Sequence, residues 1–194
     1  MDWARHAMAV LLVIALPPAV GWWFLVHPLV GFWRKLGPRI TMTVTLLCLA
    51  VSMAGLFLIR NSLVGADLGT HQALVIAAVP FLITATWIQW RRRKLLTTRI
   101  LMGIPEVAPE GESRLLTEGI YSRVRHPRYV EFTLGSLGWT LFANHSGTYA
   151  VWGLVTTMLY LVVLMEEREL RERFGAQYEE YCRRVPRFLP RLSD

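Results

Sequence analysis

The sequence predicts an all-α integral membrane bundle of five transmembrane helices, and three observations lead to this fold class: composition, apolar runs and the placement of basic residues. The 194-residue chain is 54% apolar and 18% charged, with a mean hydropathy of +0.37. A soluble domain is typically about 45–50% apolar and about 25% charged. The length suits one domain. We therefore expect residues 1–194 to form a single membrane domain.

The apolar runs give the number of spans, because a helix that crosses a bilayer needs about 20 mostly apolar residues. The runs are residues 7–30, with a kink or break expected at Pro17-Pro18, then 40–59, 73–90, 129–143 and 148–165. Three spans thus fall within residues 1–90. The fourth run is short, and residues 144–147 alone separate it from the fifth, so these two are expected to form a helical hairpin inside the bundle. No small-x-small cleavage site follows the first run, which favours a retained helix over a signal peptide.

Basic residues orient the bundle. Only Arg5 and Arg60, two of the 21 Lys and Arg residues, fall on one side of the five-span arrangement, and the other 19 fall on the opposite side. Since an excess of Lys and Arg marks the cytoplasmic face, the N-terminus should lie outside and the C-terminal helix in the cytoplasm. The bias accounts for the net charge of +7 without a nucleic-acid partner. Residues 91–94 follow the third span as an anchor for anionic membrane lipids.

The first polar region whose residues could bind a ligand or catalyse a reaction is the start of the fourth span. Pro127 suits the first turn of a helix, where its missing N–H costs nothing. The free backbone amides of this helix start, beside Arg125 and His126, would then form a site for an anionic group. Glu131 lies one turn further into an apolar segment, where an ionisable group is costly unless paired. We expect it to pair with Arg128 or Arg125, or to face a polar cavity.

The second polar region follows the fifth span. Glu166 and Glu167 lie at the membrane edge, where two carboxylates can hold an ammonium group or ribose hydroxyls. The helix should continue with Glu167–Arg171 as an i,i+4 pair and end at Phe174-Gly175. Residues 178–190 should then fold back on the interface. Cys48 and Cys182 lie in an apolar run and a basic tail, so no structural disulfide is expected.

In these two regions the chain resembles the isoprenylcysteine carboxyl methyltransferase and phospholipid methyltransferase superfamily. The resemblance covers about residues 106–190 and rests on ordered motifs: Arg125-His126-Pro127-x-Tyr129, a short hairpin, Glu166-Glu167, Phe174-Gly175, Tyr178-x-x-Tyr181 and Val185-Pro186. It implies metal-free methyl transfer from S-adenosylmethionine to a lipophilic acceptor that enters from the bilayer, with the active site on the cytoplasmic face. Residues 91–194 would be the catalytic half.

The resemblance also implies site residues. The family's cofactor contacts fall on Leu115, Leu116, Tyr121, His126, Pro127, Arg128, Tyr129, Glu166 and Glu167. Members that act on a prenylated cysteine carboxylate resemble one another in an Arg four residues before the first Glu of the pair, and Val162 stands there in this chain. An amine or thiol acceptor, as in the phospholipid branch, would have to lose a proton, and Glu131 and His126 are the candidate catalytic bases.

Two other readings compete with this one. Membrane sterol reductases, which use NADPH, share the Arg-His-Pro-x-Tyr motif and the Tyr-x-x-Tyr-Cys-x-x-Val-Pro ending, although they are longer and have more spans. A non-enzymatic scaffold or transporter subunit would use His126, Tyr129 and Glu166 for packing only. The sequence leaves the oligomeric state and the identity of the acceptor open.

Overall fold

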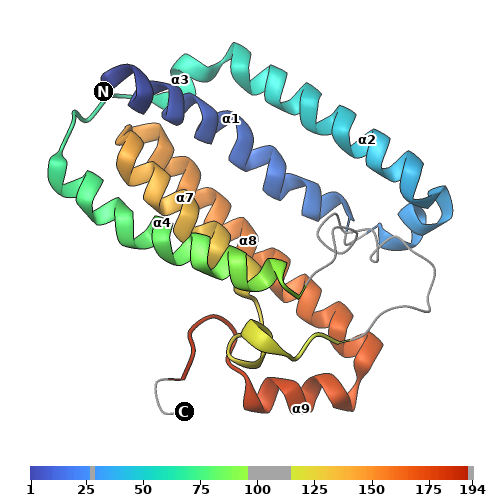
Figure 1. Cartoon of the computed structure of the whole chain (residues 1–194). Helices are drawn as coiled ribbons and strands as arrows, with labels where there is room; N and C mark the ends of the chain where they lie inside the picture. Colours follow the sequence, from blue (N-terminus) through green and yellow to red (C-terminus); the bar gives the residue numbers. More distant parts are fainter. Residues whose placement is uncertain (27–28, 96–114, 192–194) are drawn as a thin grey trace.

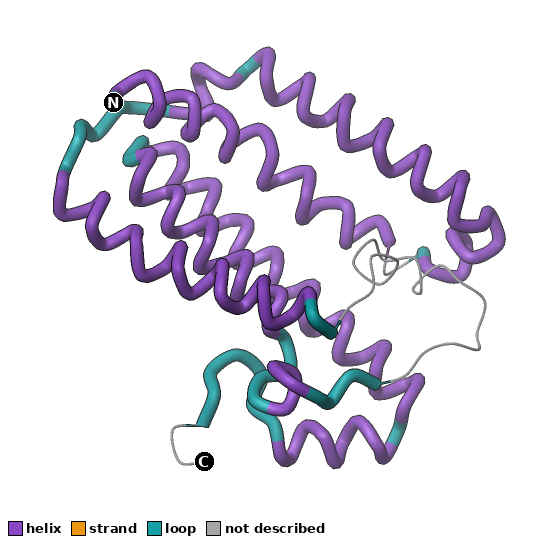
Figure 2. Tube along the Cα trace, viewed as in Figure 1, coloured by secondary structure: helices purple, strands orange, loops and turns teal. Residues whose placement is uncertain are grey.

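The computed structural model describes residues 1–26, 29–95 and 115–191, and within them the regular secondary structure is helical (Figure 1, Figure 2). The elements are α1 (Asp2–Val26), α2 (Val30–Leu58), α3 (Arg60–Val64), α4 (Gln72–Arg93), η1 (Gly119–Ser122), α7 (Pro127–Ala143), α8 (Ser146–Phe174) and α9 (Ala176–Arg184). The all-α class predicted from the sequence is confirmed.

Four of these helices are long and apolar enough to cross a membrane: α1, α2, α4 and α8. The fourth predicted span is α7, which has 17 residues, and its role as a fifth crossing helix stays a prediction. Of the kink or break expected at Pro17-Pro18, the break is wrong, because α1 runs through both prolines as one helix; a kink there stays a prediction. The chain has the build of a multi-pass membrane protein.

The bundle places α7 in its interior, as the hairpin prediction requires. This helix packs against α4 on one side and against α1 and α8 on the other, whereas α2 packs on α1 at the edge (Figure 1). Small residues make the approach to α4 possible: a Cβ at Gly138 would lie 2.7 Å from the Leu82 side chain, and one at Gly135 would lie 3.4 Å from Ala85. Close backbone approach at small residues is the usual packing mode between membrane helices.

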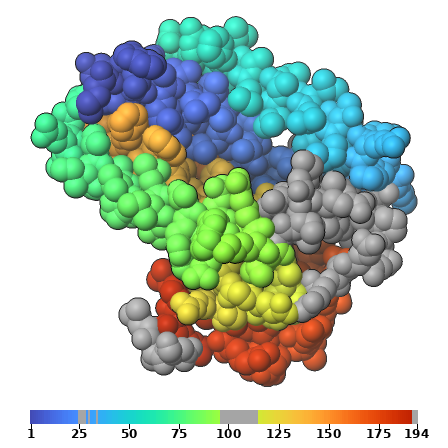
Figure 3. Space-filling model, in the orientation of Figure 1, coloured from blue at the N-terminus to red at the C-terminus, as the bar shows by residue number. Residues whose placement is uncertain are grey.

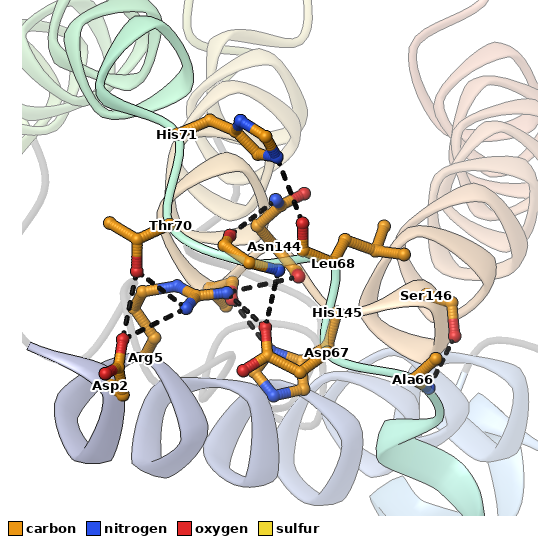
Figure 4. A network of polar contacts seen from close by, with 12 residues as sticks. Asp2, Arg5, Ala66, Asp67, Leu68, Thr70, His71, Asn144, His145 and Ser146 are labelled. Carbon is orange, nitrogen blue, oxygen red and sulfur yellow. Dashed lines mark hydrogen bonds and ion pairs between the residues drawn. The ribbon is translucent and has the colours of Figure 1, made fainter.

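A polar network fastens the end of the bundle where α7 turns into α8 (Figure 4). Arg5 of α1 is 2% exposed. Its guanidinium bonds the Asp67 carboxylate, the Thr70 hydroxyl at 2.8 Å and the Asn144 carbonyl at 3.5 Å. Asn144 ends α7 in a left-handed conformation (φ 48°) and donates to the Gly69 carbonyl at 2.9 Å. The network ties α1, the segment before α4 and the hairpin turn together.

The first turn of α8 is held equally closely. Two hydrogen bonds join Ser146 and Ala66. The Ser146 amide donates to the Ala66 carbonyl at 3.0 Å, and the Ala66 amide donates to the Ser146 hydroxyl at 2.9 Å. A Cβ at Gly147 would lie 1.7 Å from the Leu63 carbonyl oxygen. Only glycine therefore permits α3 to lie on the start of α8.

The opposite end of the molecule gathers the last turn of α4, η1, α9 and the segment after α9 (Figure 3). As predicted, α8 ends at Phe174 with Gly175 (φ 50°) as its cap, and the chain then turns back through α9. The Tyr181 hydroxyl donates to the Tyr121 carbonyl at 2.6 Å. This fold-back brings residues 185–188 alongside the start of α7, where both polar regions of the sequence meet.

Candidate functional site

The start of α7 is covered by the chain that follows α9. His126 caps the helix and Pro127 occupies its first turn, as the sequence predicts. The Arg125 amide donates to the Pro186 carbonyl at 2.9 Å, and the His126 amide donates to the Arg187 carbonyl at 3.1 Å. The returning backbone therefore satisfies the two amides directly before the helix, and the binding of an anionic group at the first amides within α7 stays a prediction.

The acidic pair at the end of the fifth run does meet this helix start, and Glu167 is its buried member. The side chain is 1% exposed and accepts two hydrogen bonds from Arg187, from Nε to Oε1 at 2.9 Å and from Nη2 to Oε2 at 2.7 Å. His126 Nε2 lies 3.1 Å from Oε1. Two more cations lie near the Glu167 carboxylate: Arg125 Nη2 is 3.4 Å from Oε1, and Arg171 Nη2 is 3.6 Å from Oε2. The predicted Glu167–Arg171 pair is thus confirmed. A buried carboxylate needs such partners, so Glu167 is occupied by the protein's own cations.

Glu166 differs from its neighbour, because one of its oxygens is buried and unsatisfied. Its side chain is 32% exposed and its Oε2 lies 3.8 Å from His126 Nδ1. Within residues 1–26, 29–95 and 115–191, that oxygen has no hydrogen-bond partner. Buried polar atoms in native proteins are nearly always partnered. Glu166 therefore presents an acceptor suited to a cationic or hydroxyl group of a ligand.

Two predicted cofactor residues, Leu115 and Tyr121, lie before η1 and within it. Leu115 packs in an apolar cluster with Tyr178, Tyr181 and Val185. Tyr121 packs beside a neighbouring apolar cluster, and burial raises the pKa of its phenol to about 12, so the group is neutral at physiological pH. Leu116 is half-buried. Of the three, Leu115 is the residue whose side chain packs against α9.

Arg128 and Tyr129 turn toward the bundle. The Arg128 guanidinium lies 4.5 Å from the Trp23 ring of α1, and Tyr129 is 7% exposed in an apolar core with Val20 and Val155. The structure therefore brings His126, Glu166 and Glu167 together, with the Tyr129 ring 5.7 Å from that of His126, whereas Arg128 packs against α1.

Glu131 has a partner that the sequence analysis did not foresee. Its Oε2 accepts from Arg92 Nε at 2.9 Å and Nη2 at 2.8 Å, and both side chains are largely buried. The expected pairing with Arg128 or Arg125 is wrong. The reason is the close packing of α4 on α7, which turns Arg92 inward while its neighbours Arg91 and Arg93 stay exposed.

Arg187 is the main site residue that sequence reasoning missed. It lies in a basic tail in which every Lys or Arg could simply contact lipid headgroups. The sequence signal that distinguishes Arg187 from these other cations is its position directly after Val185-Pro186. Among the described residues, no group of three or more His, Cys, Asp or Glu side chains is placed to hold a metal ion. Cys48 and Cys182 are both free thiols.

An apolar groove of about 230 Å³ lies between α7 and α8. Two of its lining residues, Tyr129 and Phe188, have their rings beside that of His126. The groove is lined by Tyr129, Val130, Thr133, Leu134, Thr156, Leu159, Tyr160, Val163, Phe188 and Leu189, none of which is charged. The Phe188 ring lies 6.1 Å from the His126 ring and 6.3 Å from that of Tyr160. Val162, four residues before Glu166, is fully buried in the core.

Comparisons with known proteins agree with these motifs. Residues 73–177 match the phospholipid methyltransferase family. The chain is 41% identical over 80 residues to the cobalt-zinc-cadmium resistance protein CzcN of Cupriavidus metallidurans, covering 41% of this chain and 37% of that one. It is 31% identical over 102 residues to protein-S-isoprenylcysteine O-methyltransferase B of Arabidopsis thaliana, covering 52% of each.

A third relative, methanethiol S-methyltransferase 2 of Bradyrhizobium diazoefficiens, is 42% identical over 74 residues, which are 38% of this chain and 27% of that one. The chain thus spans about half or less of the length of these relatives. No solved structure matches the chain.

Proposed function

Because the chain belongs to the phospholipid methyltransferase family, we propose that it is a membrane methyltransferase that uses S-adenosylmethionine to methylate a lipophilic acceptor. The observation that carries the proposal is the unsatisfied carboxylate oxygen of Glu166 beside His126, at the junction of α7 and α8. An NADPH-dependent reductase and a non-enzymatic scaffold are the alternatives that the experiments below separate.

The residues present fit the cofactor. S-adenosylmethionine supplies, when bound, an electrophilic methyl group on a sulfonium, and it carries an ammonium group and a ribose diol as well. Glu166 has the free acceptor that an ammonium or a hydroxyl requires. Tyr121 and Leu116, on the η1 side, would flank the adenine. Glu167 would act as a positioning residue, since its oxygens hold Arg187 and the His126 ring.

The groove between α7 and α8 gives the acceptor its path. It is apolar, and its lining includes Phe188, whose ring lies 6.1 Å from that of His126. An acceptor that lies in it places its polar end at the buried cluster, where water is excluded. In the transfer, the acceptor atom forms a bond to the methyl carbon as the carbon–sulfur bond breaks and its electron pair remains on sulfur. Alignment and dehydration would supply most of the rate.

The groove favours a thiol or amine acceptor over a carboxylate. Its lining has no cation, and the position of the relatives' carboxylate-binding Arg is held by buried Val162. A missing hydrogen bond to a charged group costs about 1.5–3 kcal/mol. A thiol or amine must lose a proton, and His126 is the better placed base because Glu131 is already held by Arg92.

Cofactor binding tests the proposal directly. Isothermal titration of the detergent-solubilised protein should show micromolar binding of S-adenosylmethionine and S-adenosylhomocysteine, and none of NADPH. Glu166→Gln should weaken this binding at least tenfold with an unchanged melting temperature. The matched control is Glu172→Gln, on the exposed face of the same helix, which should bind normally. Binding of NADPH alone, or of neither compound, would overturn the proposal.

The acceptor is then found with a labelled methyl donor, offered with long-chain thiols, lipid amines and prenylated cysteine carboxylates in parallel. We expect thiols or amines to be labelled, and labelling of the carboxylate alone would contradict the argument from Val162.

The predicted orientation has the site in the cytoplasm. A Cys at position 122 should then react with an impermeant maleimide from the cytoplasmic side, and one at position 146 from the other, in a variant that lacks Cys48 and Cys182.

A further inference from the structure

A second cavity, of about 340 Å³, lies at the same end of the bundle but on α4 and η1. It is lined by Trp87, Arg91, Lys94, Leu95, Gly119, Ile120, Ser122 and Arg123. None of these residues contacts Glu166 or Glu167 in the interactions described above. The proposed methyl transfer therefore leaves this cavity without a role.

The charge of the cavity is one-sided. Arg91, Lys94 and Arg123 bring three positive charges, and no Asp or Glu is among the lining residues. Within the described residues these three cations form no ion pair. Two are instead held by aromatic rings: Lys94 Nζ lies 3.6 Å from the centre of the Trp90 ring, and the Arg91 guanidinium lies 5.3 Å from that of Trp87. Three cations around one hollow, unpaired among residues 1–26, 29–95 and 115–191, favour a ligand of net negative charge.

The surface that leads to the cavity is apolar. On α4, Ile76, Ile83 and Trp87 are 70%, 64% and 45% exposed, and their spacing of seven and four residues puts them on one helical face. Lys94 lies a further seven residues along the same face. A ligand that covers this stripe and fills the cavity has hydrocarbon chains at one end and an anionic group at the other.

We propose that this cavity binds the phosphate headgroup of an anionic phospholipid, whose acyl chains lie along the exposed face of α4. The Ser122 hydroxyl and the three cations would contact the phosphate oxygens, and the ring of Trp87 would lie at the level of the glycerol backbone, where tryptophans concentrate in membrane proteins. A zwitterionic lipid fits less well, because the lining has no carboxylate to receive its ammonium group. Basic pockets at the cytoplasmic ends of transmembrane helices recognise anionic headgroups in this manner.

Native mass spectrometry of the detergent-solubilised full chain tests the site, with dioleoyl phosphatidylglycerol and dioleoyl phosphatidylcholine as probes. We expect the wild type to retain phosphatidylglycerol under conditions that remove phosphatidylcholine. Each Lys or Arg near an anionic lipid contributes about a fivefold gain in affinity, so the triple variant Arg91→Gln/Lys94→Gln/Arg123→Gln should bind phosphatidylglycerol about 100-fold more weakly.

The matched control is Arg173→Gln/Arg183→Gln/Arg184→Gln, which removes the same charge from exposed positions on α8 and α9 and should retain the lipid. The single reversal Arg123→Glu, outside the membrane helices, gives a second variant should the triple one fail to fold. Equal loss in both triple variants would show general charge attraction and overturn the site. Equal retention of phosphatidylcholine, or displacement of the lipid by millimolar inorganic phosphate at constant ionic strength, would overturn the assignment to an anionic lipid.

Discussion

Arg187 is linked to His126 in two ways, directly through its backbone carbonyl and indirectly through Glu167. Its carbonyl accepts the His126 amide at 3.1 Å. Its guanidinium holds both oxygens of Glu167, one of which lies 3.1 Å from His126 Nε2. The histidine ring is thus fixed by a residue far away in sequence, and the segment after α9 is part of the candidate site.

Loss of Arg187 should therefore destabilise the protein and weaken cofactor binding. Arg187→Gln leaves a buried carboxylate without its two-point partner, and breaking such a pair costs about 3 kcal/mol. Arg187→Lys should restore only part of this free energy, because a lysine cannot donate in the forked geometry. Denaturant unfolding in mixed micelles measures the change. Arg191→Gln, at an exposed position, is the control and should unfold as the wild type does; equal unfolding of Arg187→Gln would contradict the assigned contact.

The pair of Arg92 and Glu131 should behave as a structural unit. Arg92→Leu and Glu131→Leu should each lower the free energy of unfolding by about 3 kcal/mol, whereas the double variant should lose less than the sum, since no buried charge is left alone. A double-mutant cycle measures this coupling. We expect the folded double variant to retain methyl transfer, and its complete inactivity would instead support the predicted general-base role of Glu131.

Gly147 should tolerate no side chain. In Gly147→Ala the new methyl group would meet the Leu63 carbonyl, a backbone atom that cannot move aside, at 1.7 Å, so we expect a loss of about 3 kcal/mol or more. Gly153→Ala in the same helix meets nothing within 4 Å and should be neutral or stabilising by up to about 1 kcal/mol. Thermal unfolding of the two variants compares them. Similar melting temperatures would mean that α3 does not lie on α8 as described.

Asp67 should make stability depend on pH. The Gly69 amide and then Arg5 lower the pKa of this carboxyl below its ordinary value of 3.8. A lowered pKa stabilises the folded state at pH values above the unfolded pKa, and the contribution is lost as pH falls through the folded pKa. The wild type should therefore melt above Asp67→Asn at pH 6, and the gap should close below pH 4. A gap that does not change with pH would contradict the charged contact to Arg5.

The sequence predicted the elements of the fold well, because apolar periodicity and helix-end signals are local. The hairpin, the helix start at Pro127 and the helix end at Gly175 all depend on neighbours within a few residues, and all are found. The meeting of His126 with Glu167 follows from the same hairpin, because the start of α7 and the last turns of α8 lie at the same end of the bundle.

The side-chain partners could not be read in the same way. Arg92 belongs to a run of four cations, and only the packing of α4 on α7 decides that it turns inward to Glu131. The bonds from the Arg125 and His126 amides to the segment after α9 could not be foreseen, because nothing in the sequence shows that the carbonyls of Pro186 and Arg187 return to them. Such pairings depend on tertiary contacts between distant segments.

The return of residues 185–188 to the start of α7 has a consequence for biosynthesis. While that stretch is still inside the ribosome, the hairpin of α7 and α8 is already free to enter the bilayer. At that stage His126 and Glu167 lack the hydrogen bonds that the segment after α9 makes with them. The site can take shape only after translation has passed Phe188. Until then, His126 and Glu167 lack the contacts that Arg187 makes with them.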